Sequence, residues 1–224
     1  MPISFQVNPE FAQITELVPG LFICGVSALN ATNMRTYKIG LIVNATEEVP
    51  NLKSLGDIAR SKLWIKDETN ENIFSHLEPL ADQIHLILAD GGKVLVHCVA
   101  GVSRSATICL AYLTKYYCKS LREAYHLMCS KRPMVRPNLG FWRQLITFEQ
   151  LVKRTAGSVR LVRDDAQNDN LLPDVYLPQV VPERPVSPEN NDIKNEARTR
   201  RNSSSSKKFN PVLEPVPEIC EAAA

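Results

Sequence analysis

Four short apolar runs, separated by amphipathic or polar segments, set the pattern of the first hundred residues. These runs are residues 21–24, 41–44, 62–65 and 93–97. Each has the length and apolar content of a buried strand. Between the last two, apolar residues recur at three- and four-residue spacing over 73–88, which predicts an amphipathic helix ended by Gly91 and Gly92. Strands that alternate with helices predict an α/β fold: a central, mostly parallel sheet flanked by helices.

Helical patterns dominate the segment after the last apolar run. Residues 104–117 are apolar almost all round, as expected for a central helix buried against the sheet. Ser120 and Glu123 form an S-x-x-E capping box that predicts the start of the next helix. Asn138, after a proline, is the expected cap of a final helix.

The composition changes near residue 158. From there on the chain has one tyrosine, one phenylalanine and no tryptophan, but eight of its fifteen prolines. Such a segment buries too little apolar surface to offset the entropy of ordering it. We therefore predict one folded domain over 15–157 and a disordered tail over 158–224.

The stretch VLVHCVAGVSRSAT, residues 94–107, places reactive side chains between a strand and a helix. A loop in that position directs backbone N–H groups at one point, with the positive end of a helix dipole behind them, and so binds an oxyanion. The residues expected to surround the anion are Val99, Ala100, Gly101, Val102, Ser103 and Arg104. Cys98 at the floor of the loop is favoured as a thiolate nucleophile, and Arg104 offers paired donors for two phosphoryl oxygens.

The same loop resembles the HC-x5-R-[ST] signature of the cysteine-based phosphatases. The segments NATEE (44–48), AYL (111–113) and RPN-x-GFW-x-QL (136–145) extend the resemblance. Over about residues 15–154 the chain resembles a small atypical dual-specificity phosphatase. The resemblance implies the cysteine-phosphatase fold and phosphoprotein substrates carrying phosphotyrosine, phosphoserine or phosphothreonine, with MAP kinase pathway members among the candidates.

Ester hydrolysis also needs a proton for the leaving oxygen, which a thiolate cannot supply. Chemistry alone leaves three candidates in the polar segment KDETNEN: Asp67, Glu68 and Glu71. The resemblance selects Asp67 as the catalytic acid.

Three further residues have two interpretations or a supporting role. Ser105 is either a catalytic donor to the departing thiolate or a first-turn helix residue. We expect His97 to hydrogen-bond backbone and hold Cys98 in place, while Asn138 either caps its helix or also braces the phosphate-binding loop.

Charge and composition bear on the binding partners, the localisation and the cofactors to be expected. A net charge of +2 gives no support for binding nucleic acid or membranes, and no hydrophobic stretch is long enough to cross a bilayer. The N-terminus is no signal peptide, so we expect a cytoplasmic protein, and RTRRNSSSSKK leaves nuclear import open. Cysteines and histidines lack paired metal-ligand spacing, so we predict no metal and no cofactor. The oligomeric state stays open.

The main alternative is a pseudophosphatase that binds phosphorylated partners without turnover. Loss of a catalytic residue would be its expected mark, but Cys98, Arg104 and Asp67 are all present. The lysine-free loop also argues against phosphoinositide substrates. We therefore predict a dual-specificity protein phosphatase.

Overall fold

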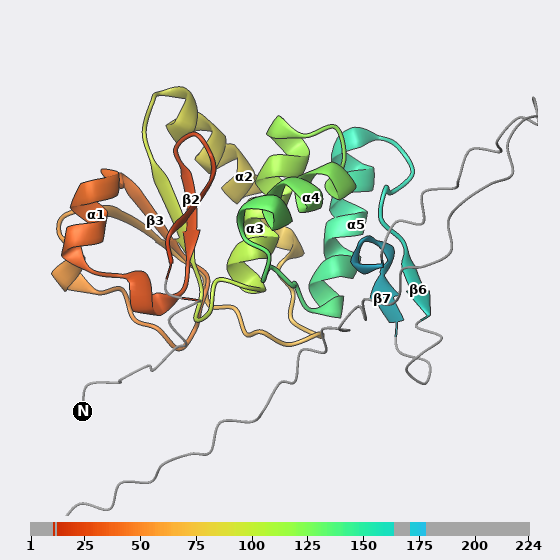
Figure 1. Cartoon of the computed structure of the whole chain (residues 1–224), viewed down its shortest axis with the longest axis horizontal. Helices are drawn as coiled ribbons and strands as arrows, with labels where there is room; N and C mark the ends of the chain where they lie inside the picture. The colour runs from red at the N-terminus through yellow and green to blue at the C-terminus, as the bar shows by residue number, and fades with distance from the viewer. Residues whose placement is uncertain (1–10, 12, 164–170, 178–224) are drawn as a thin grey trace, which may run out of the picture. The chain divides into compact units, whose positions relative to one another are not determined.

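A five-stranded sheet forms the centre of the fold (Figure 1). The computed structural model describes residues 11, 13–163 and 171–177. The strands are β1 (Thr15–Val18), β2 (Leu21–Cys24), β3 (Leu41–Asn44), β4 (Ala59–Lys62) and β5 (Val94–His97). Their order across the sheet is β1-β2-β5-β3-β4, with β1 antiparallel to β2 and the other pairs parallel. The predicted mostly parallel sheet is therefore confirmed.

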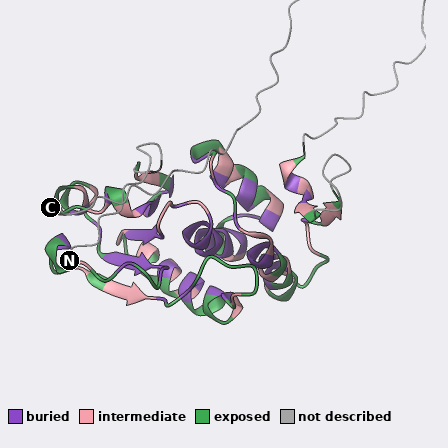
Figure 2. Cartoon of the chain, turned by 90° about the horizontal axis from the view of Figure 1, so that it is seen from below, coloured by how far each residue is buried: buried purple, intermediate pink, exposed green. Residues whose placement is uncertain are grey.

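Helices cover both faces of this sheet. They are α1 (Ala31–Tyr37), α2 (Phe74–Ala89), α3 (Arg104–Tyr112), α4 (Leu121–Lys131) and α5 (Leu139–Lys153), with short 3-10 turns η2 (Val26–Ala28) and η3 (Lys53–Leu55). The predicted central helix is α3, which continues into a π-helical turn, η4 (Leu113–Tyr117). Every residue of α3 is buried, and Figure 2 shows buried residues concentrated in the interior, with exposed residues on the outer helix surfaces.

Side chains alternate between two apolar clusters along each central strand, as the pleat requires. In β5, Val94 and Val96 pack into the cluster formed with α2 to α5, while Leu95 packs into the smaller cluster that includes Met34 of α1. Neighbouring strands β2 and β5 lead into helices on opposite faces, and α/β proteins bind ligands at the carboxyl ends of strands at such a point. Cys98 directly follows β5 and so lies at this end of the sheet.

The strand predicted at residues 62–65 lies earlier in the structure, as β4 (Ala59–Lys62). Its pairing partner β3 is only four residues long, and the last register pair joins Asn44 to Lys62. One further hydrogen bond, from Leu63 N to Asn44 O at 2.9 Å, ends the ladder. The apolar alternation is nonetheless real, because Leu63 and Ile65 are both buried beyond the strand.

The predicted tail begins too early. Within 158–177 the described residues form β6 (Leu161–Arg163), β7 (Leu171–Pro173) and the 3-10 turn η5 (Asp174–Tyr176). Val159 and Val175 are buried in the core of the domain. The segment has few apolar residues, but these pack onto the domain. The folded part therefore extends past residue 157. The disorder predicted for 164–170 and 178–224 lies outside the described residues.

Candidate active site

The carbonyl groups of the loop between β5 and α3 point away from its centre. We call residues 98–103 the anion loop. Its outward contacts are Val26 N to Val99 O (2.8 Å), Arg132 Nη2 to Ala100 O (3.2 Å), Arg132 Nε to Gly101 O (2.9 Å), Arg136 N to Val102 O (2.9 Å) and Thr107 N to Ser103 O (2.9 Å). The amide N–H groups are left facing the centre, and within the described part of the chain those of Ala100, Val102 and Ser103 donate to no protein acceptor. Converging free amides at a helix N-terminus bind a tetrahedral oxyanion.

Glycine makes the tight wrapping of this loop possible. Gly101 has a φ of 71°, and a Cβ there would lie 2.6 Å from the carbonyl carbon of Cys24 and 2.8 Å from Arg132 Nη2. Directly after β2, a Cβ at Gly25 would lie 2.8 Å from Val99 O. Two glycines therefore allow the anion loop and the end of β2 to approach each other closely.

Cys98 lies buried at the floor of the anion loop. Its Sγ is 3.1 Å from Ser105 Oγ and accepts from Gly101 N at 3.2 Å. Two neighbouring free cysteines, Cys24 and Cys109, are also buried, and burial raises the pKa of both thiols. Hydrogen-bond donors at the sulfur distinguish Cys98 from these structural cysteines. Ser105 therefore lies where its predicted catalytic role requires, on the first turn of α3.

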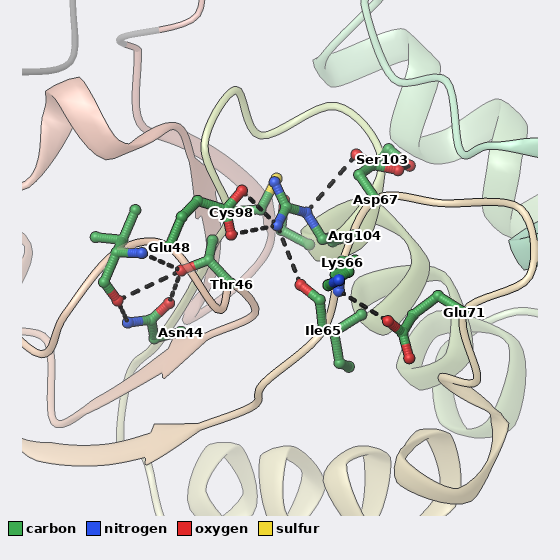
Figure 3. A network of polar contacts seen from close by, with 12 residues as sticks. Asn44, Thr46, Glu48, Ile65, Lys66, Asp67, Glu71, Cys98, Ser103 and Arg104 are labelled. Carbon is green, nitrogen blue, oxygen red and sulfur yellow. Dashed lines mark hydrogen bonds and ion pairs between the residues drawn. The ribbon is translucent and has the colours of Figure 1, made fainter.

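The buried guanidinium of Arg104 lies between two carboxylates (Figure 3). Its Nη1 lies 2.8 Å from both carboxylate oxygens of Glu48 and donates to Ile65 O at 3.1 Å. Its Nε is 3.7 Å from Asp67 Oδ2 and has no hydrogen-bond partner among the described residues. Partial burial acts to raise the pKa of Glu48, but hydrogen bonds from the backbone and Arg104, with the charge of Arg104, bring it below its ordinary value.

A polar network holds the loop that carries Glu48. Asn44 Nδ2 donates to Val49 O at 2.8 Å, and Thr46 Oγ1 donates to Asn44 Oδ1 at 2.7 Å. Lys62 Nζ from β4 donates to the same Val49 carbonyl at 2.6 Å. Sequence reasoning missed Glu48 as a site residue, although it is the last residue of the NATEE segment.

Asp67 is the acid candidate that reaches Arg104. Its Oδ1 accepts from Ser103 Oγ at 2.7 Å and from Asn138 Nδ2 at 2.9 Å. Glu71 instead binds the backbone of its own segment, accepting from Lys66 N at 3.2 Å and from the next residue, and Glu68 has only its carbonyl in contact with Asn138. The geometry therefore distinguishes Asp67 from Glu68 and Glu71, which the residue chemistry alone left as candidates for the acid.

Both interpretations of Asn138 hold at once. Its Oδ1 accepts from Phe141 N at 2.9 Å and caps α5. Its backbone N donates to Ser103 Oγ at 3.1 Å, while its Nδ2 reaches Asp67. The cap of one helix therefore connects the anion loop to the acid.

Helix α5 also holds the chain around Asp67. We call residues 66–73 the acid segment. Gln144 Oε1 accepts from Ile73 N at 2.9 Å and Phe74 N at 2.8 Å, and its Nε2 donates to Glu71 O at 2.8 Å. A Cβ at Gly140 would overlap the carbonyl of Thr69. Both residues were missed as site residues, although they belong to the RPN-x-GFW-x-QL segment.

His97 and Arg132 support the anion loop from outside. His97 is buried with Nδ1 3.4 Å from Cys98 O, as predicted, and burial, with smaller effects of Lys62 and Arg104, lowers its pKa to about 4. Arg132 was missed. Besides its two bonds to the anion loop, it donates to Gln13 O and Thr15 Oγ1 at 3.0 Å and to Phe11 O at 3.2 Å.

Comparison with known proteins shows the family of this chain. The family model described as dual specificity phosphatase, catalytic domain, matches residues 21–151. Human dual specificity protein phosphatase 18 is 36% identical over 181 residues, which cover 80% of this chain and 93% of that protein. Human dual specificity protein phosphatase 14 is 39% identical over 169 residues, covering 75% of this chain and 82% of that protein. The chain belongs to the dual specificity phosphatase family.

A solved structure supports the same assignment. The crystal structure of a mouse dual specificity phosphatase complexed with zinc tungstate superposes with a TM-score of 0.60 at 34% sequence identity. The match covers 69% of this chain and 95% of the mouse chain.

In the part of the chain that the structure describes, no group of three or more His, Cys, Asp or Glu side chains could hold a metal ion. No helix in the described ranges is long and apolar enough to cross a membrane.

Proposed function

We propose that the chain hydrolyses phosphate esters of tyrosine, serine and threonine in phosphoproteins through a cysteinyl-phosphate intermediate. The observation that carries this proposal is the meeting of Cys98, Arg104 and Asp67 around a loop whose free amides face inward. The loop supplies the anion site, the thiolate the nucleophile and the carboxyl group the proton. No single one of these features would suffice.

The first step transfers the phosphoryl group to the enzyme. The Cys98 sulfur attacks phosphorus, so that an S–P bond forms while the P–O bond to the substrate breaks. Arg104 and the inward amides stabilise charge on the equatorial oxygens. Because Glu48 occupies only Nη1 of Arg104, Nη2 and Nε can bind two phosphoryl oxygens. Asp67, protonated in this step, gives its proton to the leaving oxygen.

The second step releases phosphate. A water molecule attacks phosphorus, the Asp67 carboxylate takes its proton, and the S–P bond breaks to return the thiolate. The Ser105 hydroxyl, 3.1 Å from the sulfur, donates a hydrogen bond to that thiolate. The negatively charged leaving group is thereby stabilised.

Two observations support phosphoproteins as the substrate class. The anion loop contains no lysine, and Arg104 directly after it supplies positive charge for the phosphoryl group. Tungstate, a tetrahedral oxyanion like phosphate, is bound in the related mouse structure. Both fit a site for a single phosphoryl group presented by a side chain.

Turnover of p-nitrophenyl phosphate tests this proposal. We expect Cys98→Ser to abolish turnover but still bind tungstate, because the amides and Arg104 remain. We expect Asp67→Ala to reduce turnover most for alkyl phosphates, whose leaving groups need a proton. A wild-type rate no higher than that of Cys98→Ser would overturn the proposed phosphatase activity. The pseudophosphatase, which binds phosphorylated partners without turnover, would then be the remaining function.

A further inference from the structure

A groove of about 250 Å³ lies beside the active site, between the start of α5 and β7. Residues that line it include Arg136, Asn138, Leu139, Trp142, Leu171 and Tyr176. Sites for small molecules and cofactors are usually about 300 to 1,000 Å³. This groove is therefore of a size to take one or two amino-acid side chains.

Two residues that line the groove also contact the proposed active site. Asn138 lines the groove and donates from Nδ2 to Asp67 Oδ1 at 2.9 Å. Arg136, which lines it too, donates from its backbone N to Val102 O of the anion loop at 2.9 Å. The groove therefore lies near enough to the anion loop for a peptide whose phosphorylated side chain enters that loop to reach it.

Its lining combines apolar side chains with polar groups and a positive charge at the rim. Leu171 is 38% exposed although it is a leucine, and Leu139 is half-buried. The exposed Arg136 guanidinium lies 4.8 Å from the centre of the Tyr176 ring, and no described carboxylate forms an ion pair with it. An apolar side chain with an acidic neighbour is the complementary ligand.

Contacts made by Tyr176 hold the groove open in advance of binding. Tyr176 Oη accepts from Trp142 Nε1 at 2.6 Å and donates to Pro137 O at 3.4 Å. The two rings pack edge to face, with centroids 5.7 Å apart. A wall fixed in this way loses little entropy when a ligand binds.

We propose that this groove is a substrate-specificity subsite, which takes an apolar side chain near the phosphorylated residue while Arg136 pairs with an acidic side chain beside it. The proposal rests on the phosphatase function proposed above. It assigns a role in substrate choice to β7 and η5, the segment that follows the helical part of the domain.

A positional series of phosphotyrosine peptides tests the subsite. Each peptide carries one Leu-Glu pair, moved through the three positions on either side of the phosphotyrosine in an alanine background. We expect one position to raise kcat/KM roughly tenfold, the effect of burying most of one leucine side chain. We expect Leu171→Ala to reduce that preference below about twofold, with p-nitrophenyl phosphate as the normalising substrate.

Matched variants keep the result interpretable. Leu151→Ala removes an exposed leucine (59%) of α5 that does not line the groove, and we expect it to keep the full preference. Arg136→Ala should reduce the preference for the Leu-Glu pair only in part, because the leucine contact remains, which tests the groove even if Leu171→Ala fails to fold. Equal kcat/KM at all positions in the wild type, or a preference unchanged in both groove variants, would overturn the subsite. Absent turnover of p-nitrophenyl phosphate would overturn the phosphatase instead.

Discussion

The anion loop and the acid segment meet at Arg104, but different kinds of contact hold them. The anion loop is fixed through its backbone, because its carbonyls accept from Val26, Arg132 and Arg136. The acid segment is fixed by side chains of α5, mainly Asn138 and Gln144. An oxyanion site depends on the path of the main chain, whereas a proton donor needs only one carboxyl group in the right place.

This difference predicts two classes of variant. A change that distorts the anion loop should weaken both tungstate binding and turnover, because both use the same amides. A change on α5 should leave tungstate binding intact and reduce turnover only where the leaving group needs a proton. Measuring both quantities on each variant separates the two classes.

The largest effect is expected from Gly101→Ala. The new Cβ would lie 2.6 Å from the backbone of Cys24, at a φ of 71° that alanine rarely adopts. Strain and overlap together should lower the free energy of unfolding by about 4 kcal/mol, measured by urea denaturation. We expect the surviving folded protein to lose both tungstate binding and turnover.

Gly91→Ala is the matched control for this substitution. Gly91 has a φ of 75°, close to that of Gly101, but nothing lies within 4 Å of the new Cβ. It should cost only the backbone strain, about 1 kcal/mol, and leave binding and turnover unchanged. An equal loss of stability in both variants would show that packing against β2 does not shape the anion loop.

The pH dependence of stability gives the second largest effect. Burial lowers the pKa of His97 from 6.5 to about 4, so the unfolded chain binds a proton that the folded chain does not. Stability should therefore be complete above pH 6.5 and fall as the pH drops towards 4, by about 3 kcal/mol in total. Urea denaturation across this range measures the slope.

A His97→Asn variant tests the assignment of that slope. Its free energy of unfolding should be nearly flat between pH 6.5 and 5, even if the variant is less stable at every pH. The carboxyl groups of Glu48 and Asp82, whose pKa values are lowered, lose their contribution only at more acidic pH. An unchanged slope in His97→Asn would refute the buried, neutral histidine.

Arg132→Lys should produce a smaller loss. Lysine keeps the charge but cannot reproduce the planar set of bonds to Ala100 O, Gly101 O and the N-terminal segment. We expect about 2 kcal/mol of lost stability and roughly tenfold weaker tungstate binding, measured by calorimetry. Arg122→Lys, at the ion pair with Asp174, should reduce stability without changing tungstate affinity.

The same contrast explains what the sequence could predict. One continuous run supplies the strand, the glycine, Cys98 and Arg104, so the anion loop was predicted with its correct position between β5 and α3. Asp67 needed a family resemblance, because two other carboxylates share its polar segment and only the contact with Arg104 separates them. Residues that are neighbours in the sequence reveal the chemistry of one loop. They do not reveal a contact between segments that lie far apart in the sequence.

Glu48, Arg132 and Gln144 were missed for that reason. Each acts on a segment far from it in the sequence, and each looks like an ordinary polar residue in its own helix or loop. The tail boundary at 158 failed similarly, because composition averaged over a long segment hid the apolar residues Val159, Leu161 and Val175, which pack onto the core. The family-like segments NATEE and RPN-x-GFW-x-QL contain Glu48 and Gln144, so they were a signal for these two residues but not for Arg132.

The smallest effect is expected from Gln144→Ala, which tests the α5 side of the comparison. Removing the side chain leaves Ile73 N without its acceptor and Phe74 N with only Asn72 Oδ1, at a cost of about 1 kcal/mol. Turnover of an alkyl phosphate should fall several-fold, because the acid segment is held less firmly, while p-nitrophenyl phosphate turnover and tungstate affinity change little. Gln144→Glu keeps the acceptor and should recover most of the stability. Gln144 makes no hydrogen bond to the anion loop. If tungstate affinity nevertheless falls as much as turnover does, the anion loop and the acid segment are coupled rather than held independently.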